Sequence, residues 1–278
     1  MDYKELLRKV MSEGVDTPDR TGLGCRKIFN AQLIYQPYEF PSSTLRPLGL
    51  KYAWEEMKLF LSGDTDTKKL EEKGIMFWKG HTSREFLDSR GLQHLPEGSL
   101  GKSYSYQFGL QVQQLIEELK NDPYSRRHAI DLWGFSDQAE MPLLPCWWRS
   151  NWSVEPIRGE KPRLHLKLYS RSNDLLFGYH QAAMQYRMFQ IALARMLGMR
   201  VGLMVTDLWD VHIYSNQIEY VQELLEREEG TAGRVRLRVD KQLESLADIL
   251  ELEHTDFERV GYGPNRTPMK TPRPEIAV

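Results

Sequence analysis

Hydrophobic positions along the chain follow two different periods. Apolar residues at helical spacing predict helices over 2–12, 48–63, 65–75, 107–123, 179–199 and 216–228. Alternating or continuous apolar positions predict strands over 27–35, 128–135, 146–155, 163–172 and 200–215. Because the helices and strands do not alternate regularly, this order favours an α+β fold over a doubly wound sheet.

The longest helical pattern, 179–199, is apolar on most of its sides, which indicates a central, buried helix. Residues 82–105 are polar and rich in turn formers, so we expect a surface excursion there. The proline-rich tail from Gly261 should be irregular. Since no repeat, low-complexity tract or long linker divides the chain, the sequence predicts a single domain over 1–278.

Composition narrows the class of protein. The chain has 278 residues, of which 41% are hydrophobic and 27% charged, as in folded globular proteins. No apolar run approaches the roughly 20 residues that a membrane helix needs. Residues 1–10 lack the apolar centre of a signal peptide. We therefore expect a cytoplasmic protein without a membrane-spanning segment.

The balance of charges and the cysteine count exclude further classes. There are 37 Lys and Arg residues against 39 Asp and Glu residues, and the formal net charge is -2. Such a chain has no global field that attracts long nucleic acids, so an anionic ligand must be met by a local cluster. Cys25 and Cys146 are too few for a disulfide framework or a thiolate metal site. We expect no metal centre and no requirement for nucleic acid.

Cys146 is the candidate nucleophile of the chain. It follows a proline in LLPCWW, at the edge of a predicted strand. A guanidinium from Arg126, Arg127 or Arg171 would favour its thiolate, which is the nucleophilic form. The alternative is a buried structural cysteine, because free cysteines are often packed in cores.

Arginines in turn contexts could form an anion site. Arg20 lies in DRTGLG, and Arg126 and Arg127 follow a helix-ending Asn-Asp-Pro. Arg171 ends an alternating strand beside Ser172. Arginine suits bidentate phosphate contacts and serine adds a hydroxyl donor, so these side chains would bind a dianion if they meet in space. Otherwise the arginine pair is a solvated surface feature.

Three further places in the sequence carry polar or aromatic residues whose surroundings make them candidates for a site. Glu56 stands among apolar helix positions, where burial would raise its pKa and suit it for proton transfer; an exposed helix edge is the alternative. His212 and Tyr214 alternate, so they would share a strand face. Trp78 stands next to a turn and could belong to the core or stack on a heteroaromatic ligand.

An ordered set of motifs spans nearly the whole chain. The set comprises DRTGLG (19–24), FLSGDTD (60–66), IMFW (75–78), LGKSY (100–104), DPYSRR (122–127), LLPC (143–146), LYSRSND (168–174), FG (177–178), VHIYSN (211–216) and the tail over 261–278. In this order the motifs resemble those of the folate-dependent thymidylate synthases and their relatives, the deoxycytidylate and deoxyuridylate hydroxymethylases known from phages. The resemblance implies an α+β domain with a central mixed β-sheet flanked by helices, and a sheet face that forms a homodimer.

The resemblance also implies the substrates, a pyrimidine nucleoside 5′-monophosphate and 5,10-methylenetetrahydrofolate. Cys146 would add to C6 of the base, and the activated C5 would attack the methylene carbon. The catalytic set implied is Cys146, Glu56, Tyr104, Arg171 and Asp174. Substrate contacts would come from Arg20, Arg126, Arg127, Arg171, Ser172, Asp174, Gly178, Ala182, His212 and Tyr214. Folate contacts would come from Trp78, His81, Asp174, Gly178, Tyr262 and Val278.

Within these sets the resemblance implies distinct tasks. Arg20, Arg171 and Ser172 would hold the phosphate, and His212 with Tyr214 would hold the sugar 3′-hydroxyl. Arg126 and Arg127 would reach across a two-fold axis to the neighbouring subunit's phosphate. The tail over 261–278 would close over the folate.

Three positions depart from the family pattern. Trp147 replaces a histidine after the nucleophile, and His81 replaces a tryptophan. Ala182 stands where the synthases carry an asparagine and the deoxycytidylate hydroxymethylases an aspartate; it can neither donate nor accept a hydrogen bond. His180 or Gln181 could substitute for it. Because a polar His81 could admit or orient a water, we favour hydroxymethylation of dUMP or dCMP.

Other functions remain open at this point. Methylation would give dTMP or 5-methyl-dCMP together with dihydrofolate, and the synthase-like tail favours it. A catalytically inactive nucleotide- or RNA-binding homologue is a different class, against which the intact catalytic set argues. A cysteine hydrolase would need a histidine base near Cys146, for which the candidates are His165, His180 and His212.

Overall fold

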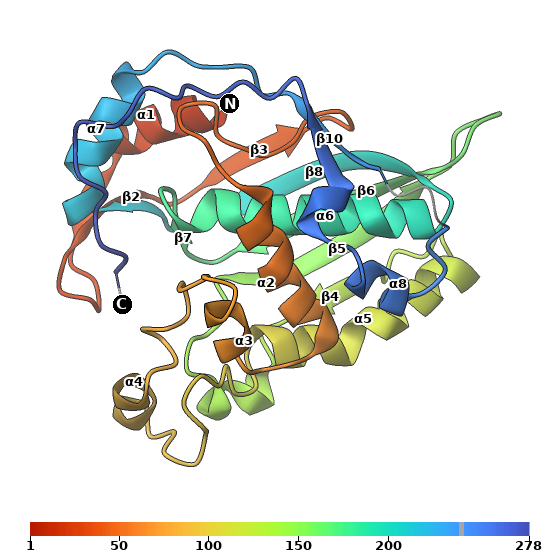
Figure 1. Ribbon diagram of the computed structural model, residues 1–278, viewed down its shortest axis with the longest axis horizontal. Coiled ribbons are helices and arrows are strands. Elements are labelled where there is room, and N and C mark those ends of the chain that lie inside the picture. The colour runs from red at the N-terminus through yellow and green to blue at the C-terminus, as the bar shows by residue number, and fades with distance from the viewer. Residues whose placement is uncertain (239–241, 278) are drawn as a thin grey trace.

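A five-stranded mixed sheet forms the centre of the protein in a computed structural model, which describes residues 1–238 and 242–277 (Figure 1). The strand order is β3-β8-β6-β5-β4. The strands are β3 (Ala31–Tyr35), β4 (Ala129–Asp131), β5 (Trp147–Glu155), β6 (Arg163–Ser170) and β8 (Arg200–Leu208). β6 and β8 run parallel, and the other neighbours run antiparallel. The predicted α+β fold with a mixed central sheet is confirmed.

Helix α6 (Gly178–Met196) packs on one face of this sheet, as the sequence predicts for a central helix (Figure 1). Sixteen of its 19 residues are buried, so its apolar side chains need no polar face. Even Arg187 is buried, and its guanidinium donates to the carbonyls of Gln36, Glu39 and Gly202. These bonds offset the cost of removing a charged group from water.

Helices α2 (Leu50–Ser62) and α5 (Tyr104–Asn121) pack beside α6. α2 ends at Gly63, whose φ of 73° is left-handed, as the sequence predicts for a glycine stop. α2 crosses α5 where Gly63 meets Gly109, and a Cβ added to Gly109 would lie 2.4 Å from the Gly63 Cα. The two helices therefore approach each other through glycine backbone.

A second sheet carries part of the candidate site. Its order is β1-β2-β9-β7, formed by β1 (Val15–Thr17), β2 (Cys25–Ile28), β7 (Asn173–Asp174) and β9 (Val211–Tyr214). The single strands expected over 27–35 and 200–215 are wrong, because each is broken into two. β2 pairs with β9 in the second sheet, and β3 pairs with β8 in the central sheet. The two paired segments, 25–35 and 200–214, therefore cross from one sheet to the other at the same place. Asp210 has a φ of 45° at the break between β8 and β9.

The remaining elements surround these two sheets. They are α1 (Tyr3–Glu13), α3 (Lys68–Glu71), α4 (Arg84–Ser89), η1 (Phe135–Glu140), η2 (Ser215–Gln217), α7 (Ile218–Glu226), β10 (Arg234–Leu237), α8 (Leu246–Leu250), η3 (His254–Asp256) and β11 (Phe257–Val260).

The surface excursion expected over 82–105 is wrong in part. It contains α4, and Thr82 and Ser103 are buried through hydroxyl bonds to Thr67 and to the Leu143 carbonyl. These internal partners explain why the two ends of this polar segment are buried.

The tail over 261–277 forms no helix and no strand beyond a single bridge between Thr231 and Gly263, as the sequence predicts. It runs along α7 and ends on the side of the molecule where β7 lies (Figure 1). Over 1–238 and 242–277, no helix is long and apolar enough to cross a membrane.

Candidate active site

One cavity of about 240 Å³ gathers most of the predicted site residues. It lies between α2, α6, the start of β5 and the end of the chain. Of the residues predicted for the base and the chemistry, Glu56, Tyr104, Cys146, Asp174 and Ala182 line it. Of those predicted for phosphate, sugar or folate, the cavity is lined by Arg20, Trp78, His81, Ser172, Gly178 and Tyr214.

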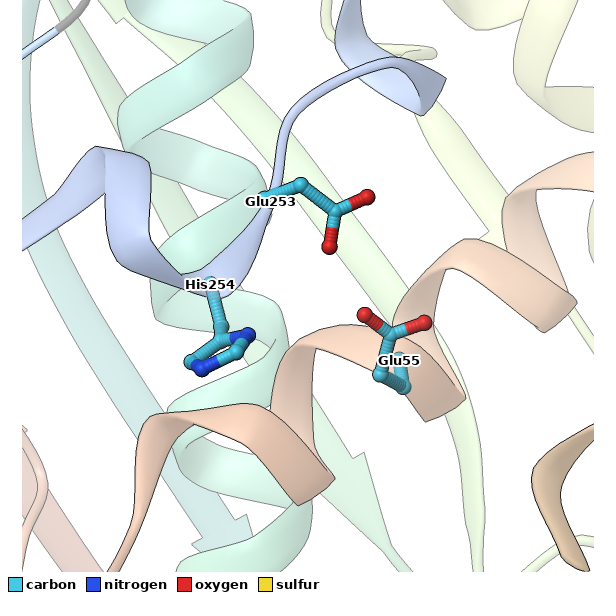
Figure 2. A group of neighbouring side chains, drawn as sticks. All are labelled: Glu55, Glu253 and His254. Carbon is cyan, nitrogen blue, oxygen red and sulfur yellow. The ribbon is translucent and has the colours of Figure 1, made fainter. Parts of the chain in front are cut away.

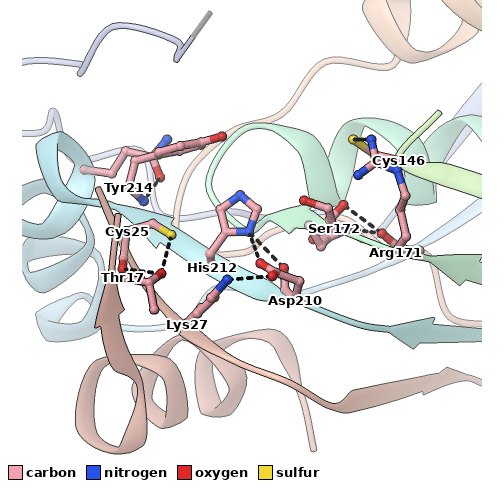
Figure 3. Close-up of polar contacts among 12 residues, drawn as sticks. Thr17, Cys25, Lys27, Cys146, Arg171, Ser172, Asp210, His212 and Tyr214 are labelled. Atoms are coloured by element: carbon pink, nitrogen blue, oxygen red, sulfur yellow. Dashed lines mark hydrogen bonds and ion pairs between the residues drawn. The ribbon is translucent and has the colours of Figure 1, made fainter. Parts of the chain in front are cut away.

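Cys146 stands immediately before β5, on a loop that Arg171 holds. Arg171 donates through Nε to the Pro145 carbonyl and through Nη2 to the Leu144 carbonyl, both at 2.9 Å. The same Nη2 lies 4.0 Å from the Cys146 Sγ (Figure 3). Burial raises the pKa of the thiol, and the charge of Arg171 opposes that effect. Of the three candidate arginines, Arg171 is the one that reaches the nucleophile.

Tyr104, the first residue of α5, fixes the backbone of the nucleophile. Its hydroxyl accepts the Cys146 N–H at 2.6 Å. Its ring stacks on Phe60 at 5.2 Å and meets Trp78 edge to face at 5.5 Å. Burial raises the pKa of Tyr104 well above its usual range, so the phenol stays protonated and can still donate.

Glu56 projects from α2 into the cavity and is 5% exposed. Its Oε1 accepts Trp78 Nε1–H at 2.6 Å. Its Oε2 accepts Gln181 Nε2–H at 2.8 Å and a further bond from Gln185 Nε2. Burial raises the pKa of Glu56, and these three bonds act in the opposite direction. The buried position that the sequence offered for Glu56 is confirmed.

The cavity wall on α6 is a stripe at helical spacing. Gly178, Gln181, Ala182 and Gln185 stand at i, i+3, i+4 and i+7, and all four line the cavity. Gln185 is missing from the residues predicted for the site, although its spacing from Gln181 places both on one helix face. His180 falls on another side of α6, bonded to the Pro41 carbonyl at 3.1 Å. It therefore cannot take the place of the missing polar group at Ala182.

Asp174 ends β7 beside the start of α6. Its Oδ1 accepts the N–H groups of Leu176 and Phe177, and its Oδ2 accepts Gln217 Nε2–H at 3.2 Å. Burial raises the pKa of the Asp174 carboxyl, and the charge of His212 opposes that effect. The carboxylate is thus held in place by three donors at the cavity wall.

His212 and Tyr214 share one face of β9, as their alternation predicts, with ring centroids 5.0 Å apart. His212 Nδ1 donates to the Asp210 carbonyl at 2.8 Å and lies 3.3 Å from its Oδ1 (Figure 3). Lys27 Nζ pairs with the other carboxylate oxygen of Asp210 at 2.7 Å. Tyr214 lines the cavity. Asp210 and Lys27, which the sequence did not single out, therefore hold the His212 ring.

No histidine of the described segments bonds to the Cys146 sulfur. The three candidate bases of a hydrolase have other partners. His165 bonds to Glu155 at 3.1 Å, His180 to the Pro41 carbonyl, and His212 to the Asp210 carbonyl. This arrangement lacks the pairing of nucleophile and base that a cysteine hydrolase uses.

Comparison with known proteins points in the same direction. A family model described as thymidylate synthase matches residues 1–272. The chain is 32% identical to the thymidylate synthase of Candida albicans, across 94% of this chain and 93% of that protein. It is 31% identical to the thymidylate synthase of Saccharomyces cerevisiae, across 95% and 93%.

The chain belongs to the thymidylate synthase family. It is also 32% identical to the bifunctional dihydrofolate reductase-thymidylate synthase of Paramecium tetraurelia, and that match covers 94% of the chain and 58% of the Paramecium protein. Membership confirms the predicted class of enzyme, a one-carbon transferase, and the predicted co-substrate, methylenetetrahydrofolate. The comparisons do not support the hydroxymethylase that the sequence favoured, and they support its alternative, methylation.

The four arginines that the family resemblance assigns to one phosphate site lie in two separate places in this chain. Arg20 lines the cavity and Arg171 lies beside it. Arg126 and Arg127 are exposed between α5 and β4, do not line the cavity, and bond to no other residue in the described part of the chain. The predicted phosphate cluster is therefore incomplete within one subunit.

The residues predicted to contact folate from the thymidylate synthase motifs also fall into two groups, those that line the cavity and those that do not. Trp78 and His81 line the cavity, and burial and the charge of Arg20 lower the pKa of His81. Tyr262 does not line it; its hydroxyl donates to the Ser43 carbonyl at 2.8 Å instead. Val278 lies outside the described residues. Two residues that the predictions omitted, Ile276 and Ala277, bring the end of the tail to the cavity.

A group of possible metal ligands lies away from the cavity. Glu55 on α2 approaches Glu253 and His254, as Figure 2 shows. Lys58 pairs with Glu55 at 3.2 Å and with Glu253 at 2.9 Å, and Lys73 also pairs with Glu55. Because ammonium groups already balance these carboxylates, the group is a salt-bridge network that fastens η3 to α2.

Proposed function

We propose that this protein methylates C5 of a pyrimidine nucleoside 5′-monophosphate in a folate-dependent reaction that gives the 5-methyl nucleotide and dihydrofolate. The observation that carries the proposal is the union in one cavity of Cys146, Glu56 and Tyr104. The named relatives are thymidylate synthases, which supports a methyl product. Methylenetetrahydrofolate supplies the carbon and the hydride.

Cys146 is the nucleophile in this proposal. Its thiolate adds to C6 of the base, which makes C5 nucleophilic toward the methylene carbon. After the C5 proton is lost, the folate leaves and transfers hydride to that carbon, and the C6–S bond then breaks and returns the thiolate. Arg171 supports the thiolate through its charge 4.0 Å from Sγ. The bond from the Cys146 N–H to Tyr104 keeps the sulfur at a fixed position. Reversible addition needs both the fixed position and a thiol that is not permanently ionised.

Glu56 is the proton-transfer group. Burial raises the pKa of this carboxyl, so it takes up a proton more readily than an exposed glutamate does, which suits it to general acid and base catalysis. Trp78, Gln181 and Gln185 orient both of its oxygens. Glu56 therefore moves protons to and from the base edge without moving itself.

The phosphate and the sugar take the polar end of the cavity. Arg20, Arg171 and Ser172 bind the phosphate, and the partner subunit completes the site through its Arg126 and Arg127. His212 and Tyr214 bind the sugar hydroxyl. Because Nδ1–H is committed to the Asp210 carbonyl, the Nε2 atom of His212 is left for that hydroxyl.

The folate fits the opposite wall. Trp78, Phe177, Ile276 and Ala277 give that wall apolar surface for a flat heteroaromatic ring. Asp174 accepts three hydrogen bonds and keeps acceptor capacity for a ring N–H. The tail over 261–277, whose end brings Ile276 and Ala277 to the cavity, closes over the ring. Gly178 leaves room at the start of α6, where an added Cβ would meet only the Asp174 Cβ at 3.7 Å.

Hydroxymethylation is the second candidate function, and one observation favours it. His81 is a polar side chain inside the cavity, packed against Trp78 and Phe86. A neutral imidazole there could hold a water that adds to the exocyclic carbon in place of hydride.

Product analysis separates the two functions. The protein is incubated with methylenetetrahydrofolate and dUMP, dCMP or CMP, and the nucleotide mass and the absorbance of dihydrofolate are recorded. Methylation predicts the mass of one added methyl group and stoichiometric dihydrofolate. A hydroxymethyl product without dihydrofolate would overturn methylation. Cys146→Ala should abolish turnover and keep nucleotide binding; retained turnover would refute the nucleophile.

A further inference from the structure

The wall that α6 gives to the cavity has an apolar position between two amides. Ala182 offers no hydrogen bond, whereas Gln181 and Gln185 stand on either side of it on the same helix face and line the same cavity. His180 is turned to the Pro41 carbonyl. Recognition of the base edge on this wall therefore depends on the two glutamines.

Glu56 determines how both amides are oriented. An ionised carboxylate only accepts hydrogen bonds, so the end of each glutamine that faces it must be the NH₂ group. Gln181 Nε2 and Gln185 Nε2 both donate to Oε2 of Glu56. The Oε1 atoms of the two glutamines bond to no other residue in the described part of the chain. The two amides therefore have carbonyl oxygens left for a ligand.

The free Oε1 atoms of Gln181 and Gln185 can only accept hydrogen bonds, so they favour a ligand that presents N–H donors to this wall. On this edge, cytosine carries at position 4 an amino group with two N–H donors, whereas uracil carries an acceptor oxygen there and a single donor, N3–H. The amino group of cytosine can donate to both carbonyls, whereas uracil would leave at least one buried acceptor unpaired, which weakens binding. We infer that Gln181 and Gln185, oriented by Glu56, make this site select a 4-aminopyrimidine nucleotide, a cytidine-type monophosphate, over a uridine-type one. The inference rests on the proposed function and names its base.

Binding and turnover test the inference separately. Equilibrium binding of dCMP and dUMP is measured by calorimetry on the full chain without folate. Release of tritium from [5-³H]dCMP and [5-³H]dUMP is then measured with methylenetetrahydrofolate, because loss of the C5 proton reports C5 substitution whether the product is methyl or hydroxymethyl. We expect dCMP to be preferred by about ten- to hundredfold, the ratio that one or two unpaired acceptors produce.

Substitutions on α6 identify the residues responsible. Gln181→Met keeps the length of the side chain and removes the carbonyl, so the dCMP to dUMP ratio should fall about tenfold or more. Ala182→Asn adds an amide with a donor, and it should raise dUMP binding. Gln113→Ala, on the exposed face of α5, is the matched control and should leave the ratio unchanged.

Each outcome decides one of the two proposals. Equal binding of the two nucleotides, or a preference for dUMP, overturns base selection by the glutamines. An unchanged ratio in Gln181→Met overturns it as well. Tritium release from neither nucleotide refutes the proposed function, and the binding ratio still decides the base. Release from dUMP with poor use of dCMP keeps the function and refutes the inference.

Discussion

The Cys146 thiol lies under two opposing influences. Burial disfavours the charged thiolate and raises its pKa, whereas the guanidinium of Arg171, 4.0 Å away, favours the thiolate. Burial is the larger effect, so the unliganded site holds a protonated thiol at neutral pH. The thiolate therefore forms as the pH rises above the usual range of a thiol.

Alkylation of Cys146 by iodoacetamide should follow this balance. The rate should rise with pH through a midpoint above that of an ordinary thiol, because only the thiolate reacts. Arg171→Leu should slow alkylation at pH 8 by about tenfold, since it removes the guanidinium that lies 4.0 Å from the sulfur. Peptide mass spectrometry separates Cys146 from the buried Cys25.

Arg171→Lys is the control for this measurement. Lysine keeps the charge but cannot hold the Leu144 and Pro145 carbonyls as arginine does, so it should recover part of the alkylation rate. The electrostatic account would be refuted by an Arg171→Leu variant with an unchanged pH profile.

Single residues differ in how far the sequence could predict their place. Glu56 stands among apolar positions of a helix, a pattern that leaves both burial and an exposed helix edge open, and the structure shows that it is buried. Gln185 lies one helical turn beyond Gln181, so the pattern could have found it, although nothing in the sequence shows that Glu56 would meet both amides. The bond from Tyr104 to Cys146 joins residues 42 positions apart, and no local pattern predicts such a contact.

At the scale of elements, the crossing of α2 and α5 depends on glycine. A Cβ at Gly109 would lie 2.4 Å from the Gly63 Cα and 2.9 Å from its N, so the helices must separate to admit it. Gly109→Ala should therefore lower the free energy of unfolding by about 1–3 kcal/mol, the usual cost of overpacking. Urea denaturation measures the loss.

The matched control for Gly109 lies on the same helix. Gln113→Ala changes an exposed position of α5 and should alter the free energy of unfolding by less than about 0.5 kcal/mol. If Gly109→Ala is as stable as this control, the two helices do not need the close glycine contact.

A carboxylate of α7 is one of the groups that hold the tail, beside Arg227 at the end of that helix. Glu223 accepts the N–H groups of Lys270 and Thr271 at 2.8 and 2.7 Å, and these bonds lower its pKa. Glu223→Gln should loosen the tail. The glutamine oxygen could accept one backbone N–H, but its NH₂ group would face the other backbone N–H, and two donors cannot bond to each other. Trypsin should then cut after Lys270 or Arg273 about three times faster or more, as expected when local opening becomes easier.

Glu219→Gln provides the comparison, since Glu219 is exposed on the same helix. The lowered pKa of Glu223 also sets the sign of the pH dependence: docking should persist above its pKa and weaken in acid, as the carboxyl is protonated. Equal cleavage of the two variants would show that Glu223 does not hold the tail.

Elements were predicted well where the pattern is local and poorly where pairing is distant. The helices over 48–63 and 179–199 have strong periodicity, and they form as α2 and α6. The segments over 27–35 and 200–215 each read as one strand. Their breaks arise because β2 joins β9 and β3 joins β8, which are pairings between distant segments. Tertiary pairing overrides the local pattern there.

At the scale of the whole molecule, one chain leaves two features without partners. The face of the central sheet opposite α6 keeps residues such as Ile34 half exposed. Arg126 and Arg127 extend into solvent away from the cavity. A two-fold dimer through the sheet face would account for both, because it would cover the sheet and bring each arginine pair to the other subunit's phosphate.

Mixed dimers test this arrangement. A chain with Arg126→Ala and Arg127→Ala should be nearly inactive because its phosphate site is incomplete, and a Cys146→Ala chain should be inactive because it lacks the nucleophile. In a dimer of the two, one site combines an intact Cys146 with arginines from the other chain. Random pairing after co-expression should therefore restore about one quarter of the wild-type activity per site, since half of the dimers are mixed and each has one working site.

Two tags allow the mixed dimer to be purified, and it should have about half of the wild-type activity per site. Each homodimer carried through the same purification gives the background. If the arginines act within their own chain, every site in the mixed dimer lacks either the nucleophile or the arginine pair, and mixing restores nothing. A nucleotide KM that stays normal in the arginine variant would refute their role in phosphate binding, whichever subunit supplies them.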